Sequence, residues 1–134
     1  MISGDDMVIA HHEACHAVAA LHFGRRVDFV GRGRGHGLTT YDPVLVNGDL
    51  KRRAVESGVI TLAPFFEDPV GCAYDLAILD GLLAAGVSLS RTWEETAALE
   101  SDPEYRRKVR VVESALWGHP HLTGDEVVLL IAAS

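Results

Sequence analysis

The residues of this chain best suited to chemistry stand close to its start, in the sequence His12-Glu13-Ala14-Cys15-His16. His12 and His16 are four residues apart, so on a helix of about 3.6 residues per turn they lie within about 40° of each other on one face. Both imidazoles can therefore reach one metal ion. Glu13 is rotated by about 100° from His12, which places its carboxylate beside a water on the metal rather than among the ligands.

This pattern predicts zinc-dependent hydrolysis of peptide bonds. Zinc lowers the pKa of a bound water to about 7, and a neighbouring carboxylate can take the proton as the water attacks a polarised carbonyl. We therefore expect zinc as cofactor, His12 and His16 as ligands, and Glu13 as the general base. A competing interpretation is that the pattern arose by chance among seven histidines. In that case His12 faces solvent and His16 is a hydrogen-bonded core residue.

A catalytic zinc site needs a third ligand, for which there are three candidates. His22 has the spacing of a longer histidine motif, but that motif needs a glycine where Ala19 stands. On an unbroken helix His22 lies about 240° from His16, on another face. Glu67 follows the second expected helix, and Asp75 falls in the first turn of the third, where a carboxylate is favoured. On spacing alone, Asp75 is as well explained by stabilising its own helix end.

The surrounding sequence predicts a mainly helical fold with a small β element. Gly24 is expected to end the first helix, and Pro64 to end or kink the second. Thr123-Gly-Asp-Glu126 is a capping-box pattern at the start of the last helix. The first expected helix runs from Asp5 or Asp6 to about Gly24, and residues 27–30 and 38–41 suggest two short strands or an irregular edge. The other expected elements are a helix from Asn47 or Asp49 to Leu62, and helices over about 72–85, 93–99, 103–117 and 123–131.

Composition favours one domain over residues 1–134, because 134 residues with 48% hydrophobic side chains can build one core. The net charge of -7 is the wrong sign for a protein that neutralises phosphates, so we expect no nucleic-acid partner. The start has acids where a secretory signal has basic residues, and no apolar run approaches the roughly 20 residues of a membrane-spanning helix. We therefore expect a cytoplasmic protein without membrane insertion, whose cysteines are reduced.

Three segments of the chain carry a family resemblance: His12-Glu-Ala-Cys-His16-Ala-Val, the stretch 27–40, and Gly71-Cys-Ala-Tyr-Asp75-Leu. In this order they resemble the H-E-A-G-H-A-V helix, the following strand with its arginine-glycine segment, and the G-A-x-x-D-L segment of the FtsH-type ATP-dependent membrane zinc proteases. In that family the aspartate is the third zinc ligand. The resemblance implies that Asp75 completes the site, and that the chain is a stand-alone peptidase domain without ATPase or membrane segments.

The resemblance also implies a substrate site. In the family, the strand after the motif helix offers its edge to the substrate, and such backbone pairing makes little demand on sequence. Here that place is taken by Gly35, His36, Gly37, Leu38 and Thr39, with His36 a candidate for stabilising the oxyanion. The expected substrates are flexible peptides or unfolded segments, which a separate partner chain could deliver. The oligomeric state is left open.

Cys15 is a departure from the family pattern, which has glycine at this position. The thiol is either an inert core residue or, if turned inward, a group that perturbs the site. The altered stretch Leu62-Ala-Pro-Phe-Phe-Glu-Asp68 is a second departure. Together they leave a second function open: a peptide- or partner-binding module on the same fold that no longer cuts.

Overall fold

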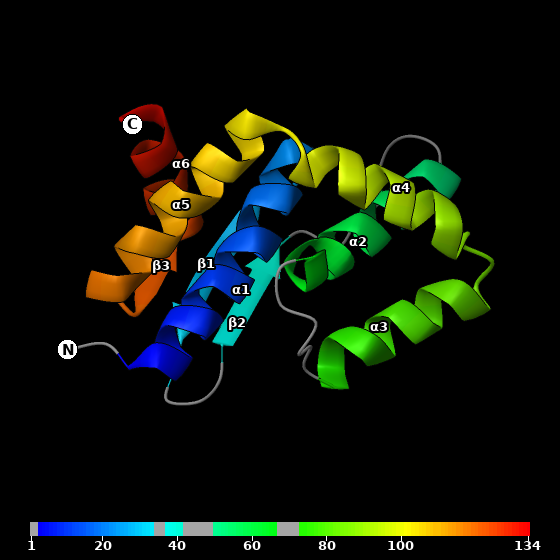
Figure 1. Cartoon of the computed structure of the whole chain (residues 1–134), viewed down its shortest axis with the longest axis horizontal. Coiled ribbons are helices and arrows are strands. Elements are labelled where there is room, and N and C mark those ends of the chain that lie inside the picture. The colour runs from blue at the N-terminus through cyan, green and yellow to red at the C-terminus, as the bar shows by residue number, and fades with distance from the viewer. Residues whose placement is uncertain (1–2, 34–36, 42–49, 67–72) are drawn as a thin grey trace.

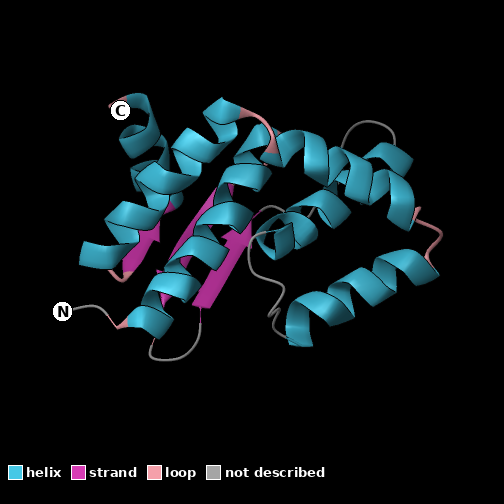
Figure 2. Ribbon diagram, in the orientation of Figure 1, coloured by secondary structure: helices cyan, strands magenta, loops and turns pink. Residues whose placement is uncertain are grey.

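The computed structural model describes residues 3–33, 37–41, 50–66 and 73–134. These residues form α-helices, one short 3-10 helix (η1) and a three-stranded antiparallel sheet (Figures 1 and 2). The elements are α1 (Gly4–His22), β1 (Val27–Arg32), β2 (Gly37–Tyr41), α2 (Leu50–Leu62), η1 (Ala63–Phe66), α3 (Ala73–Ala84), α4 (Leu89–Glu100), α5 (Pro103–Gly118), β3 (His121–Thr123) and α6 (Gly124–Ala132). The prediction of a mainly helical fold with a small β element is confirmed.

Helix α1 is the centre of the molecule and lies against the sheet, with α5 on one side and α2 on the other (Figure 1). Its residues from 13 to 20 are all buried, and small alanines among them allow close packing. The helix is capped by Ser3, whose hydroxyl accepts a hydrogen bond from the Asp6 backbone N–H. The prediction of a cap at Asp5 or Asp6 is therefore wrong. Both acids lie in the first turn, where their negative charge interacts favourably with the helix dipole.

The sheet has the order β2-β1-β3, so β2 is an edge strand among the described residues. Val30 of β1 is fully buried and lies opposite Thr39 of β2 and Leu122 of β3. The two strands expected from the sequence are confirmed with slightly longer bounds. Strand β3 was not expected, because three residues between two helices are too short for an alternating pattern.

Gly124 lets the last helix start close against the sheet. A Cβ at this position would lie 1.5 Å from the carbonyl oxygen of Val27, which is backbone. We expect Gly124→Ala to lower the free energy of unfolding by about 1–3 kcal/mol, because the sheet or α6 must shift. Gly81→Ala in α3 is the control: a Cβ there meets nothing within 4 Å, so the variant should be about 1 kcal/mol more stable. Urea denaturation of both variants tests the contrast, and equal stabilities would contradict it.

Local rules account for several helix ends. The Thr123 hydroxyl accepts from the Glu126 backbone N–H and the Glu126 carboxylate accepts from the Thr123 N–H, so the expected capping box is confirmed. Gly86, just past α3, has a φ of 99° that suits glycine. Helix α4 begins at Leu89, earlier than expected, because Ser88 caps it. None of the described helices has both the length and the hydrophobicity of a membrane-spanning segment.

Candidate metal centre

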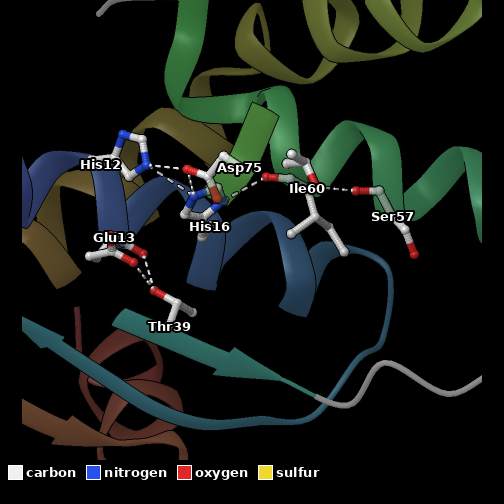
Figure 3. A network of polar contacts seen from close by, with 8 residues as sticks. His12, Glu13, His16, Thr39, Ser57, Ile60 and Asp75 are labelled. Carbon is white, nitrogen blue, oxygen red and sulfur yellow. Dashed lines mark hydrogen bonds and ion pairs between the residues drawn. The ribbon is translucent and has the colours of Figure 1, made fainter. Parts of the chain in front are cut away.

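Two histidines of α1 and one aspartate of α3 meet at one point, although Asp75 is 63 residues from His12 (Figure 3). The Asp75 Oδ2 atom lies 2.8 Å from His12 Nε2 and 3.2 Å from His16 Nε2, and the two Nε2 atoms are 3.1 Å apart. The His12 side chain is only 13% exposed, so the interpretation in which it faces solvent is wrong. Among the described residues, no other three His, Cys, Asp or Glu side chains bring their ligand atoms this close together.

The three ligand atoms fit a zinc ion. Around tetrahedral zinc with bonds of about 2.0–2.1 Å, ligand atoms lie about 3.3 Å from one another. The distances of 2.8, 3.1 and 3.2 Å in the cluster are close to this value. Two imidazoles and one carboxylate also match the three-ligand donor set of catalytic zinc sites, which keep one position open.

The orientation of His16 is set by α2. Its Nδ1 atom lies 2.8 Å from the carbonyl oxygen of Ile60, and because a carbonyl only accepts, Nδ1 must carry the proton. This leaves Nε2 free to face His12 and Asp75, as the ring nitrogen of a metal ligand must be. Helix α2 ends two residues later at Leu62 and continues as the 3-10 helix η1, which contains Pro64. The prediction that this proline ends or kinks the helix is confirmed.

In the absence of a metal, Asp75 is linked to His12 and His16 by hydrogen bonds, and these contacts shift the pKa values of the cluster. Burial acts to raise the pKa of the Asp75 carboxyl, but the hydrogen bonds from His12 and His16 outweigh it and hold this pKa below its ordinary value. Burial likewise acts to lower the pKa of His16, yet the adjacent Asp75 and Glu13 carboxylates raise it above its ordinary value. A metal ion that binds here must therefore displace a proton.

Glu13 lies beside the cluster without belonging to it. Its side chain is 6% exposed, and its carboxylate accepts a hydrogen bond of 2.7 Å from the Thr39 hydroxyl of β2 (Figure 3). Burial raises the pKa of this carboxyl, although His16, Thr39 and His12 oppose the shift. Glu13, His16, Asp75 and Thr39 line one cavity of about 250 Å³. The cavity therefore lies beside the Glu13 carboxylate and two members of the cluster, His16 and Asp75.

Only part of the segment expected to bind substrate lies within the described residues. Gly37, Leu38 and Thr39 lie on the edge strand β2 and line the same cavity as Glu13, with Leu38 52% exposed. Gly35 and His36 lie outside the described residues, so the oxyanion hypothesis for His36 stays a prediction.

Of the competing third ligands, His22 is not part of the cluster. His22 is exposed at the C-terminal end of α1, where its ring packs against Phe23 with the centroids 5.0 Å apart. This placement agrees with the argument that an unbroken helix turns His22 away from His16. Glu67 lies outside the described residues.

Cys15 belongs to the hydrophobic core and is 2% exposed. Its Sγ atom lies 3.5 Å from His11 Nε2, and it shares a cavity with Tyr105 and Val109 of α5. Burial raises the pKa of the thiol, which favours the unreactive protonated form. The structure therefore agrees with the interpretation of Cys15 as a core residue.

Sequence reasoning missed two contacts of this site. The contact of His16 with the Ile60 carbonyl could not be predicted from the sequence, because every residue has a backbone carbonyl. The Thr39 hydroxyl bonds Glu13, a contact that was not predicted, while the prediction that Thr39 contacts substrate stays a prediction. Strand alternation contained a signal for this contact, because Gly37 and Thr39 must share one face while Leu38 faces the other.

In comparisons with known proteins, no protein-family model matches this chain and no curated protein matches it. The fold and the site therefore define the protein only by its geometry. It is a mainly helical protein with a buried His-His-Asp cluster and a separate glutamate beside it. Function is therefore argued from the site itself.

Proposed function

We propose that this chain is a zinc-dependent metallopeptidase in which His12, His16 and Asp75 hold the metal and Glu13 is the general base. One observation carries the proposal: two members of the three-residue cluster, His16 and Asp75, line the same cavity as Glu13, a carboxylate outside the cluster. A metal site that serves only structure uses four protein ligands and needs no base beside them. The resemblance to the FtsH-type peptidase domain, on the motif helix and on Asp75, supports the same assignment.

Glu13 performs the proton transfers in the proposed reaction. Zinc held by His12, His16 and Asp75 would supply Lewis-acid chemistry, which would make water more acidic and polarise the substrate carbonyl. The Glu13 carboxylate takes one proton from the attacking water as its oxygen bonds to the carbonyl carbon. It then gives this proton to the leaving amine nitrogen when the C–N bond breaks. A pKa raised by burial suits a group that must both accept and donate a proton near neutral pH.

The proposed substrates are extended peptides or unfolded segments. Strand β2 lies at the edge of the sheet and also lines the cavity, so an added peptide strand would run past Glu13 and the cluster. Tyr41 and Ile78 also line the cavity and give it an apolar part. With this arrangement the site would require little of the peptide sequence beyond one apolar side chain. The peptide could arrive free in solution or be delivered by a partner chain.

The first test combines metal content with cleavage. We expect about one zinc per purified chain by elemental analysis, and zinc-dependent cleavage of a mixture of unstructured peptides detected by mass spectrometry. A chelator should stop cleavage, and added zinc should restore it. A zinc-loaded chain that binds these peptides but cleaves none would overturn the proposal in favour of the binding module.

Zinc binding should release protons, because the metal replaces the proton on His16. The pKa of His16 lies above its ordinary 6.5, so between that value and the raised pKa the zinc-free site holds a proton that zinc must displace. The imidazolium stabilises the zinc-free fold fully below pH 6.5, and this contribution is lost as pH rises through the raised pKa. Zinc affinity should therefore increase with pH across this range. Calorimetry in buffers of different ionisation enthalpy measures the release, and its absence would contradict the protonated cluster.

A further inference from the structure

The general base is held from a second element of the fold. Glu13 is on α1, and the residue that contacts its carboxylate is Thr39 on β2, 26 residues later. The Thr39 hydroxyl lies 2.7 Å from Glu13 Oε1 and 3.2 Å from the Glu13 backbone oxygen. A hydroxyl has one proton to donate, and the shorter contact is to the carboxylate. The side chain is thus tied to the sheet through one oxygen.

The same strand also leaves room for the carboxylate. A Cβ at Gly37 would lie 2.6 Å from Glu13 Cγ and 2.8 Å from Glu13 Oε2, closer than such atoms approach in proteins. Any other residue at this position would push the Glu13 side chain or β2 aside. Gly37 and Thr39, two residues apart on one face, therefore define where the two carboxylate oxygens lie.

A general base works only when its free oxygen points at the proton it takes. A glutamate side chain has three rotatable bonds, and misplacing a reacting group by about 1 Å can cost roughly 100-fold in rate. Because Thr39 engages Oε1, the contact restrains the Glu13 side chain, and Oε2 is the oxygen that would take the proton. Because the Thr39 hydroxyl acts as a donor to the carboxylate, it does not compete with Glu13 for the proton of the attacking water.

We propose that Thr39 is a positioning residue for Glu13, and that Gly37 is required at its position to make space for the positioned carboxylate. The inference deepens the proposed function and rests on it. It assigns the Thr39 hydroxyl to the base, while the Thr39 backbone remains part of the strand edge proposed for substrate. The hydroxyl acts through Glu13 and needs no contact with substrate.

The kinetic test replaces the hydroxyl while keeping the shape. Thr39→Val should lower kcat by about 10- to 100-fold with KM little changed, because the base is present but no longer oriented. Thr39→Ser keeps a hydroxyl and should restore most of the activity. Thr96→Val is the matched control: its buried hydroxyl donates to the Thr92 carbonyl of its own helix, away from the cavity, and its loss should leave kcat unchanged. A Thr39→Val variant that raises KM at full kcat would overturn the proposal and return Thr39 to substrate binding.

A second measurement does not depend on activity. In protein labelled with ¹³C at the glutamate carboxyl carbon, the Glu13 resonance is identified by its absence from the Glu13→Gln variant. At one fixed pH it should shift in Thr39→Val and stay near its wild-type position in Thr39→Ser and Thr96→Val. An unchanged resonance in Thr39→Val would overturn the contact. If the zinc-loaded wild type cleaves no peptide, the proposed function fails, and the resonance still decides whether Thr39 holds Glu13.

Discussion

Glu13→Gln is expected to abolish peptide cleavage while zinc stays bound. The amide has nearly the size of the carboxylate, and its oxygen can still accept the Thr39 hydrogen bond, so the local packing is kept. It cannot take a proton from water, and loss of a general base costs about 10²- to 10⁴-fold in rate. Zinc should remain because Glu13 is not one of the three clustered side chains proposed to bind it. Initial rates and zinc content, measured on the same preparation, check both parts.

Glu104→Gln is the control for this experiment. Glu104 is an exposed acid of α5 that pairs with Arg107, so the same change of charge there should affect neither rate nor zinc. Cleavage that persists at the wild-type rate in Glu13→Gln would show that the assigned mechanism is wrong. Loss of zinc together with activity would instead place Glu13 among the groups that hold the metal.

The parts of the site that lie within one helix could be predicted from the sequence. His12 and His16 share a face because helix geometry alone decides it, and the same geometry turns His22 away. Helix ends were predictable where a local signal is strong, as at the Thr123 capping box and at Gly86. The cap of α1 was not, because Ser3, Asp5 and Asp6 are all good caps and the sequence alone does not choose among them.

The parts that join distant elements could not be predicted by spacing. Whether Asp75 faces the histidines depends on how α3 approaches α1, and the first turn of a helix is an ordinary place for an aspartate. The order of the motifs, rather than periodicity, singled it out, and the structure brings it to the histidines. The contact of Thr39 with Glu13 depends in the same way on how β2 packs against α1.

Asp75→Ala is expected to lose zinc and, with it, the stabilisation that zinc provides. Even outer-shell partners of a metal site are typically worth 10- to 100-fold in affinity, so removing a ligand should weaken zinc binding by more than about 100-fold. Asp75 is the member of the cluster that comes from α3, whereas both histidines come from α1. Zinc would therefore tie α3 to the centre of the molecule, and adding it should raise the Tm of the wild type but not of Asp75→Ala.

Two substitutions separate this effect from a general loss of charge or of histidine. Asp80 is an exposed acid on the same helix, so Asp80→Ala should keep both the zinc and the rise in Tm. His22→Ala should also keep them, because His22 is exposed at the end of α1 and turned away from the cluster. Zinc that survives in Asp75→Ala but disappears in His22→Ala would mean that the metal binds through a break in α1, and it would refute the cluster as the ligand set. If zinc is lost only in Asp75→Ala, then metal binding depends on the contact between α1 and α3, and the proposed hydrolysis depends on that contact as well.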